Sequence, residues 1–158
     1  MQRLGIAGAL ALAAVIAPLG ALAQSSGLTG RWHWNPSQST STPGETPPRD
    51  VLLVIGSASP AHVHWELTII DPNGGRHVQS FDGSGDGKPA AVTGAPPGTA
   101  GKLTVSGTSY EADYTNPDGS SDRSTCTLSP DGKTLTCRGA DSDGKGHSVP
   151  YTDVYDRQ

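Results

Sequence analysis

The segment at residues 62–70 reads HVHWELTII, and its alternation decides the fold class. The segment alternates apolar residues with the polar residues His64, Glu66 and Thr68; the apolar residues are Val63, Trp65, Leu67 and Ile69. In an extended chain successive side chains point to opposite faces, so the apolar residues share one face. Antiparallel sheets that cover a core on one side and face water on the other have this alternation. The segment therefore predicts a half-buried β-strand.

Similar short runs continue on both sides of this segment, separated by turn sequences such as DPNGG at 71–75. No stretch after the first 23 residues keeps an apolar helical period for three turns. We expect an all-β chain with little helix and loops at 37–48 and 82–101. The expected strands are a first one beginning at Trp32, then 51–55, 62–70, 76–81, 102–106, 109–115, 122–128, 133–138 and 147–156. About eight consecutive strands favour closure into a small antiparallel up-and-down barrel, because closure removes exposed sheet edges.

The first 23 residues have the order of a secretory signal peptide. Arg3 precedes an apolar run that ends in the small-residue sequence ALA before Gln24. An uncleaved membrane anchor is less favoured, because Gly and Pro interrupt the run and a spanning helix needs about 20 apolar residues. We expect a signal peptide at 1–23, a mature domain at 24–158, a periplasmic or secreted location and no membrane insertion after cleavage.

The composition limits the partners. The chain has 15 Asp and Glu against 11 Lys and Arg, a formal net charge of −4. Cleavage would remove only Arg3 and leave about −5, so nucleic acid and anionic lipid are poor partners. Hydrophobic residues make up 34% of the chain, which predicts a small core with little apolar surface for a large chamber. We expect a monomer.

Cys126 and Cys137 are the two cysteines of the chain. An even number of cysteines in an exported domain indicates a disulfide. A metal site and a reactive thiol are the alternatives, and the metal site lacks a third soft ligand nearby. We expect a bridge between the two residues and no metal.

The register of the hairpin that carries these cysteines has two solutions. A two-residue loop at 131–132 pairs Cys126 directly with Cys137. Pro130 instead prefers the second position of a type I turn over residues 129–132, which leaves the cysteines diagonal. Both solutions keep the two cysteines on one face, and we favour the direct pair.

Short motifs near both ends of the mature chain resemble those of a known protein family. The sequences GRWHWNPSQS at 30–39, DGKTLT at 131–136 and VYDR at 154–157 resemble a family of small exported bacterial proteins of unknown function. Those proteins look like lipocalin-type, or calycin, barrels. The family usually has Lys where this chain has Gln38.

The resemblance implies structural roles for three residues. Gly30 would permit a tight entry into the first strand, and Trp32 would plug one end of a lipocalin-like barrel. Arg157 matches the basic residue of the last strand that lies over this Trp in calycins, where a guanidinium stacks on the indole. These roles describe how a barrel closes and leave its function open.

Two polar patterns could bind metals, and each has a simpler interpretation. His62, His64 and Glu66 lie on one strand face, but three ligands in a straight row converge poorly on zinc, so a solvated face is favoured. The loop DGSGDG at 82–87 begins like a calcium loop, but Thr93 stands where a bidentate acid is needed. We favour a flexible glycine-rich loop there.

No catalytic constellation or cofactor motif is present: the chain has no Gly-x-Ser-x-Gly elbow. Tyr110 and Tyr114 are predicted to point into the core, with their hydroxyls at its rim. We expect an exported, non-enzymatic, lipocalin-like protein without a cofactor that binds a small apolar or amphipathic ligand through Trp65, Tyr110 and Tyr114. The alternative is an envelope or secreted protein that binds a protein partner through its loops, for example as a hydrolase inhibitor. A continuous pocket would support the first function, and a filled barrel with an apolar loop patch the second.

Overall fold

The computed structural model describes residues 27–40 and 46–158, which form ten β-strands and no helix. The expected signal peptide at 1–23 and its cleavage site lie outside the described residues. The strands are β1 Gly30–Trp34, β2 Asp50–Ala58, β3 Val63–Ile70, β4 Arg76–Gly83, β5 Asp86–Thr93, β6 Ala100–Ser106, β7 Ser109–Thr115, β8 Ser121–Leu128, β9 Thr134–Ser142 and β10 Ser148–Arg157.

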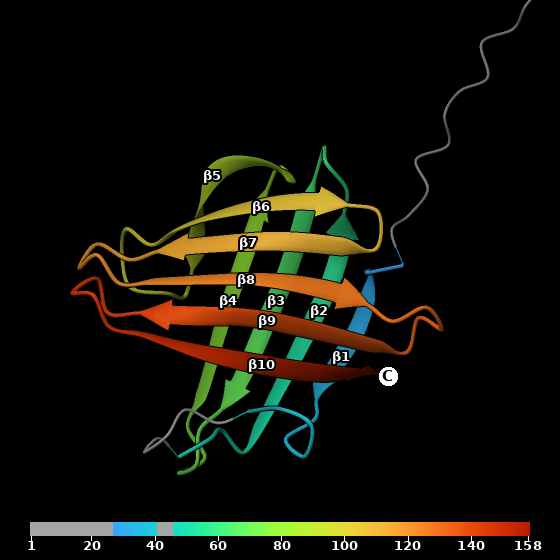
Figure 1. The fold of residues 1–158 in the computed structure, drawn as a ribbon, viewed down its shortest axis with the longest axis horizontal. Helices are drawn as coiled ribbons and strands as arrows, with labels where there is room; N and C mark the ends of the chain where they lie inside the picture. The colour runs from blue at the N-terminus through green and yellow to red at the C-terminus, as the bar shows by residue number, and fades with distance from the viewer. Residues whose placement is uncertain (1–26, 41–45) are drawn as a thin grey trace, which may run out of the picture.

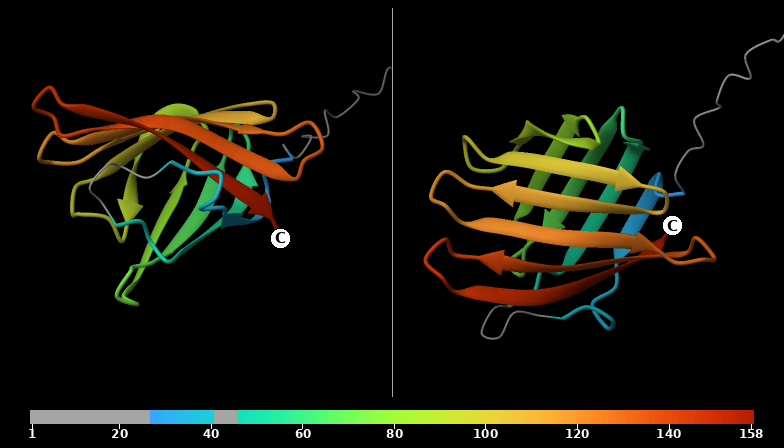
Figure 2. Two further views of the ribbon diagram at one scale, coloured as in Figure 1. Left: turned by 60° about the horizontal axis from the view of Figure 1, so that its bottom comes forward. Right: turned by 45° about the horizontal axis from the view of Figure 1, so that its top comes forward.

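The ten strands form one closed antiparallel barrel in sequence order, as the alternation predicted. Each strand pairs with the next, and β1 pairs with β10 to close the ring. Figure 1 shows β6–β10 crossing in front of β1–β4. The two views of Figure 2 show these groups as two layers around a shared interior. The expected all-β, up-and-down barrel is confirmed.

The number of strands differs from the expected eight or so, chiefly because β5 occupies part of the expected loop at 82–101. Its sequence DGKPAAVT contains Gly and Pro, and Val92 is its one buried residue, so it lacks the alternation of the other strands. The pairing of β5 with β6 also shifts register between Asp86 and Pro89. Its pairing with β4 spans only two residue pairs. Tertiary pairing rather than local pattern makes this segment a strand.

The core is concentrated toward one end of the barrel. Along β3 the inward residues Val63 and Trp65 are buried, whereas Leu67 and Ile69 are partly exposed. β8 shows the same gradient, from partly exposed Asp122 to buried Leu128. The fully buried large side chains are Trp32, Phe81, Leu28, Leu103, Leu135 and Cys126. One end is therefore packed, and the other keeps a partly solvated interior.

The packed end carries the junction between the first and last strands. Trp32 is fully buried, and its indole N–H donates to the Leu28 carbonyl at 2.9 Å. Arg157 is its direct partner in the β1–β10 register, with the guanidinium carbon 4.2 Å from the Trp32 ring centre. The same guanidinium donates to the Thr29 carbonyl at 2.9 Å.

Gly30 makes this junction possible. Its φ is +147°, and a Cβ there would lie 2.6 Å from a guanidinium nitrogen of Arg157. Any larger residue would therefore displace the Arg157 side chain that covers Trp32. The three residues given structural roles by the resemblance thus meet at one point.

A disulfide joins Cys126 in β8 to Cys137 in β9, as expected from the cysteine count. The two residues are direct partners in the β8–β9 register, and Leu128 pairs with Leu135 two positions on. The direct pairing is therefore correct.

The connecting loop combines features of both predicted solutions. The Gly132 N–H donates to the Ser129 carbonyl at 2.9 Å, which closes a β-turn with Pro130 in its second position. Lys133 then adds one residue before the Ser129 N–H donates to the Thr134 carbonyl at 2.8 Å. The extra residue lets the proline turn coexist with the direct register, so the expected two-residue loop is wrong while the pairing it implied holds.

Candidate ligand-binding cavity

The partly solvated half of the interior contains a cavity of about 310 Å³. Inward side chains from both layers form its walls, and most of them are apolar or aromatic. The polar side chains in the lining are Gln79, Thr99, Asn116, Asp122, Ser124 and Asp153, besides the tyrosine hydroxyls. A mostly apolar concavity with a few placed polar groups is typical of small-molecule sites.

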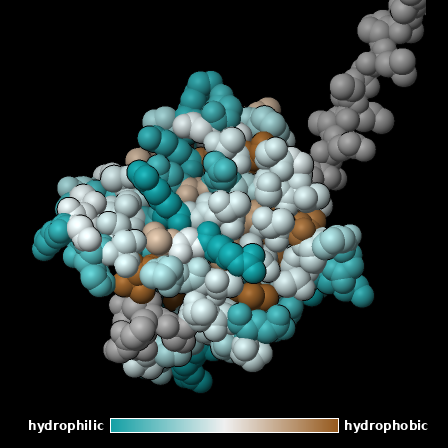
Figure 3. Space-filling view, in the orientation of Figure 1, coloured by the Kyte–Doolittle hydropathy of each residue, from teal (hydrophilic) through white to brown (hydrophobic). Residues whose placement is uncertain are grey.

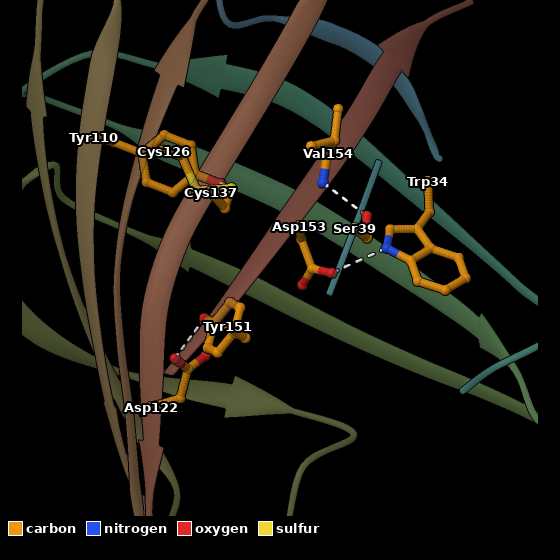
Figure 4. The surroundings of a disulfide bond; sticks show 9 residues. All are labelled: Trp34, Ser39, Tyr110, Asp122, Cys126, Cys137, Tyr151, Asp153 and Val154. Carbon is orange, nitrogen blue, oxygen red and sulfur yellow. Dashed lines mark hydrogen bonds between the residues drawn. A yellow bond between two sulfur atoms is a disulfide. The ribbon is translucent and has the colours of Figure 1, made fainter. Parts of the chain in front are cut away.

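Trp65, Tyr110 and Tyr114, the residues predicted to contact a ligand, all line this cavity. The Trp65 ring stacks on Phe81, with centres 6.2 Å apart and planes at 14°. Tyr114 meets Trp65 edge-on at 6.0 Å and 87°. The Tyr110 hydroxyl lies 3.9 Å from the Cys137 sulfur. Figure 4 shows Tyr110 beside the disulfide. Trp65, Phe81 and Tyr114 thus pack together as one aromatic wall. Contact of Trp65, Tyr110 and Tyr114 with a ligand stays a prediction.

One polar atom of that wall is unsatisfied. Trp65 is 7% exposed, and its indole N–H has no hydrogen-bond partner among the described residues. Burial raises the pKa of the neighbouring Tyr114 hydroxyl well above its usual value, and the nearby Trp65 N–H opposes part of that change. Because this contact with Tyr114 falls short of a well-formed hydrogen bond, the Trp65 N–H can still donate to an acceptor.

A second cavity, of about 320 Å³, lies toward the partly solvated end and adjoins the first. Trp34, Val51 and Ile69 are among its apolar walls, with Thr40 and residues 46–48 from the β1–β2 connection. The two cavities share Leu67, Asp122, Tyr151, Asp153 and Tyr155. These five residues form the boundary between the two cavities, so a ligand that extends from the inner cavity into the outer cavity would pass beside them.

Two carboxylates of this shared boundary are held by neutral donors. The Tyr151 hydroxyl donates to Asp122 at 2.6 Å, and the Trp34 indole N–H donates to Asp153 at 2.9 Å. Figure 4 draws both hydrogen bonds, with Asp122 on β8, Tyr151 and Asp153 on β10 and Trp34 on β1. A third carboxylate, Asp141, faces Asp122 directly in the β8–β9 register and is exposed at the rim of the outer cavity.

Burial and mutual repulsion shift the acidity of these groups. Burial raises the pKa of Asp122 to about 6, the Tyr151 hydrogen bond opposes this, and the charges of Asp141 and Asp153 add to it. Burial likewise raises the pKa of Asp153, against the Trp34 hydrogen bond. The pKa of Tyr151 is also raised, by burial and by the Asp122 charge. The environment of these carboxylates therefore disfavours their negative charge.

Two inward glycines create space for the tyrosines. A Cβ on Gly139 would lie 2.8 Å from the Tyr151 ring, and one on Gly101 would lie 2.8 Å from the Tyr114 ring. Each glycine is the direct cross-strand partner of the tyrosine it accommodates. The missing side chains let both rings lie across the sheet, and at Gly139 they also let β9 lie close to Arg123 and Ser124 of β8.

The histidines considered for zinc lie on the outer surface, away from the cavities. His62 and His64 both contact the Asp82 carboxylate, at 3.1 and 3.2 Å. Glu66 shares their face of the sheet but pairs with Ser80. Within 27–40 and 46–158, no three His, Cys, Asp or Glu side chains are grouped to hold a metal ion.

The segment at 82–87 considered for calcium contains the end of β4, residues 84–85 and the start of β5, so most of it is strand rather than the flexible glycine-rich loop that was favoured. The Asp86 carboxylate accepts hydrogen bonds from Ser84 at 2.5 Å and Lys88 at 2.6 Å. These partners hold the pKa of Asp86 at about 2.

Sequence reasoning did not select Trp34, Asp122, Asp141, Tyr151 or Asp153 as site residues. For some of them, the position in the strand indicated an inward side chain, because alternate residues of a strand point to the same face. Asp122 has the same parity as Cys126 and Leu128, so an inward face for the cysteine implies an inward carboxylate. The meeting of β8, β9 and β10 carboxylates at one cavity follows only from the three-dimensional closure.

Comparison with known proteins identifies the class of fold. No family model and no curated protein sequence matches the chain. A redesigned β-barrel covers 84% of this chain and 93% of its own length, with 18% identity and a TM-score of 0.53. A single-residue variant of the fluorescent protein UnaG covers 84% of this chain and 96% of its own, with 13% identity and a TM-score of 0.55. These likenesses show a lipocalin-like β-barrel fold, and the narrower resemblance to exported bacterial proteins stays an expectation.

The disulfide is typical of proteins outside the reducing cytoplasm. Among the described residues there is no helix of sufficient length and apolarity to span a membrane.

Proposed function

We propose that this protein is a non-enzymatic binding protein that holds a small amphipathic ligand inside its barrel. The observation that carries the proposal is the cavity of about 310 Å³ with its aromatic wall and a few polar side chains in its lining. Preformed cavities of this size and lining suit small organic molecules. Trp65, Tyr110 and Tyr114 are the residues proposed to contact the apolar part.

The chemistry of the lining favours binding over catalysis. His and Lys, the commonest bases and amine nucleophiles, are not among the residues that line either interior cavity in the described chain. The two cysteines in the lining are joined to each other. The aromatic wall is fixed by ring stacking, which preorganises a surface for an apolar body.

We also propose that the protein works outside the cytoplasm. The signal-like sequence at 1–23 supports export, and the disulfide supports an oxidising destination. Whether the destination is the periplasm or the medium depends on the envelope of the host.

A protein-binding role through the loops would need a continuous apolar patch on the surface. Figure 3 views the face formed by β6–β10 and shows hydrophobic residues scattered among polar ones. Scattered apolar residues are ordinary on monomeric proteins, so this face offers no support for the alternative.

The proposal can be tested by filling the cavity. Ala112 is buried and lines the inner cavity, whereas Ala91 is exposed on the outside of β5. Binding of the neutral fluorescent probe phenyl-naphthylamine would be titrated for the full chain, for Ala112→Phe and for Ala91→Phe. We expect Ala112→Phe to weaken binding at least tenfold and Ala91→Phe to leave it unchanged.

Overpacking can destabilise a core, so Ser124→Leu provides a second filling variant from a partly exposed part of the wall. Folding would be checked by circular dichroism and by the absence of titratable thiols. A folded filling variant that binds the probe as tightly as the parent would overturn the proposal. Native mass spectrometry of protein purified from its own host would show a retained ligand as added mass.

A further inference from the structure

We infer that the ligand is an amphipathic organic cation, whose charged end lies among Asp122, Asp153 and Asp141 and whose apolar body lies against Trp65. This inference rests on the proposed function, because it assigns a charge and an orientation to the occupant of the same cavity.

The first argument is the charge of the lining. Asp122 and Asp153 stand at the boundary shared by both cavities, and Asp141 lies at the outer rim. Neither cavity is lined by a Lys, Arg or His side chain of the described residues. The interior therefore presents only negative formal charge to an occupant.

The second argument is the free-energy cost of burying these carboxylates without a paired cation. Partly buried carboxylates are normally paired with a cation, because neutral hydrogen bonds replace only part of their lost hydration. Asp122 and Asp153 have the neutral donors Tyr151 and Trp34. The raised pKa of each carboxyl shows that these donors do not compensate for burial and repulsion. A bound cation would supply the missing charge.

The third argument is the chemistry on the opposite wall. Trp65 is only 7% exposed and lines the inner cavity, and its indole N–H forms no hydrogen bond of full geometry with the described residues beyond a weak interaction with the Tyr114 hydroxyl. Such a donor favours an acceptor on the ligand body. The aromatic rings of Trp34, Tyr151 and Tyr155 line the outer cavity beside the carboxylates, and aromatic faces attract ammonium groups. Aromatic rings and carboxylates together suit an alkylammonium group attached to an apolar body.

The geometry favours an organic cation over a metal ion. Calcium takes six to eight oxygen ligands and magnesium needs a near-octahedral set. No group of three potential ligands in the described part of the chain is arranged for a metal. A long occupant that spans from the rim to Trp65 would also use both cavities, which a single ion cannot do.

A matched set of probes tests the sign of the charge. Naphthyl-ethylamine, naphthyl-ethanol and naphthyl-acetate share one aromatic body and carry a cationic, neutral or anionic end. Their affinities for the full chain would be measured by calorimetry at about pH 7.5 and moderate salt. We expect the amine to bind at least tenfold more tightly than the alcohol, about the effect of one charge-assisted hydrogen bond, and the acid to bind most weakly.

Three substitutions locate the effect. Asp122→Asn and Asp153→Asn should each weaken amine binding about tenfold and leave alcohol binding within about twofold. Asp156→Asn is the matched control, because Asp156 lies on the same strand as Asp153 but is exposed on the outside of the barrel. This control should change neither affinity.

The outcomes separate the inference from the proposed function. Equal binding of amine and alcohol, tighter binding of the acid, or an amine preference that survives both aspartate substitutions would overturn the cationic ligand and leave an apolar binding site. If none of the three probes and no neutral dye binds, the proposed function fails as well.

Discussion

Asp122→Asn should stabilise the ligand-free protein at neutral pH, because the charge of Asp122 is unfavourable in the folded chain. Burial, together with the charges of Asp141 and Asp153, raises the pKa of Asp122 from 3.8 to about 6. The native state consequently binds this proton more tightly than the unfolded chain does. The resulting stability is fully present below about pH 4 and is lost as the pH rises through about 6.

The size of the effect follows from the pKa change. A difference of about two in pKa corresponds to about 3 kcal/mol at most, and partial contact of Asp122 with solvent reduces this to about 1 to 2 kcal/mol. Asn retains an oxygen that can accept the Tyr151 hydroxyl hydrogen bond. Asp122→Asn should thus be about 1 to 2 kcal/mol more stable than the parent at about pH 7.5, with a difference that shrinks toward about pH 4.

The groups that face Asp122 define what the pH profile reports. Tyr151 and Asp153 approach from β10, Asp141 from β9, and Asp113 and Tyr114 belong to β7. The assay is urea denaturation of extensively dialysed protein at several pH values between about 4 and 7.5. A variant less stable than the parent at about pH 7.5, or a stability difference that does not change with pH, would refute the reasoning.

Asp131 provides a control of opposite sign. The Ser129 hydroxyl and the Lys133 N–H hold the pKa of this exposed carboxyl below its usual value. Its contribution to stability is present above the unfolded pKa and is lost as the pH falls. Asp131→Asn should therefore change stability with the opposite pH trend to Asp122→Asn.

Three further predictions concern the framework. Trp32→Ala truncates a large core side chain and should lower the free energy of unfolding by about 3 to 5 kcal/mol, and Arg157→Ala should lower it by about 1 to 2 kcal/mol. Additive effects of the two substitutions in a double-mutant cycle, measured by denaturant unfolding, would contradict the contact between Trp32 and Arg157. Reduction of the Cys126–Cys137 bridge should lower the free energy of unfolding by about 2 to 3 kcal/mol, and two titratable thiols in unreduced, unfolded protein would exclude the bridge. Gly101→Ala should displace the Tyr114 ring, the nearest neighbour of a Cβ at that position, and weaken probe binding in the cavity. Unchanged probe affinity in a fluorescence titration would show that the ring has room to move.

The sequence predicted those parts of the fold that depend on local alternation. The β3 segment alternates clearly, and turn sequences separate most strands, so their order and antiparallel pairing could be inferred. Strand β5 could not be inferred, because its Gly and Pro residues are unfavourable in strands and the segment becomes a strand only through its pairing with β6. The Cys126–Cys137 pairing could be inferred because face parity and covalent geometry restrict the register strongly.

The candidate site was only partly predictable for a physical reason. Trp65, Tyr110 and Tyr114 are inward aromatic residues, and alternation alone places them at the interior. The carboxylates have the same parity, but sequence patterns treat a charged residue in a strand as solvent-facing. Asp122 and Asp153 come together because β8, β9 and β10 are neighbours at the partly solvated end, a consequence of closure rather than of any single strand.

The combination of a small hydrophobic core and interior carboxylates supports a binding function over a structural one. Asp122 and Asp153 replace apolar side chains at positions that could have added to the core, and the environment of each disfavours its charge there. Stability alone would select against each of these choices, because burying apolar surface stabilises and burying charge does not. Their joint presence around one cavity is what a site that sacrifices stability for ligand recognition requires.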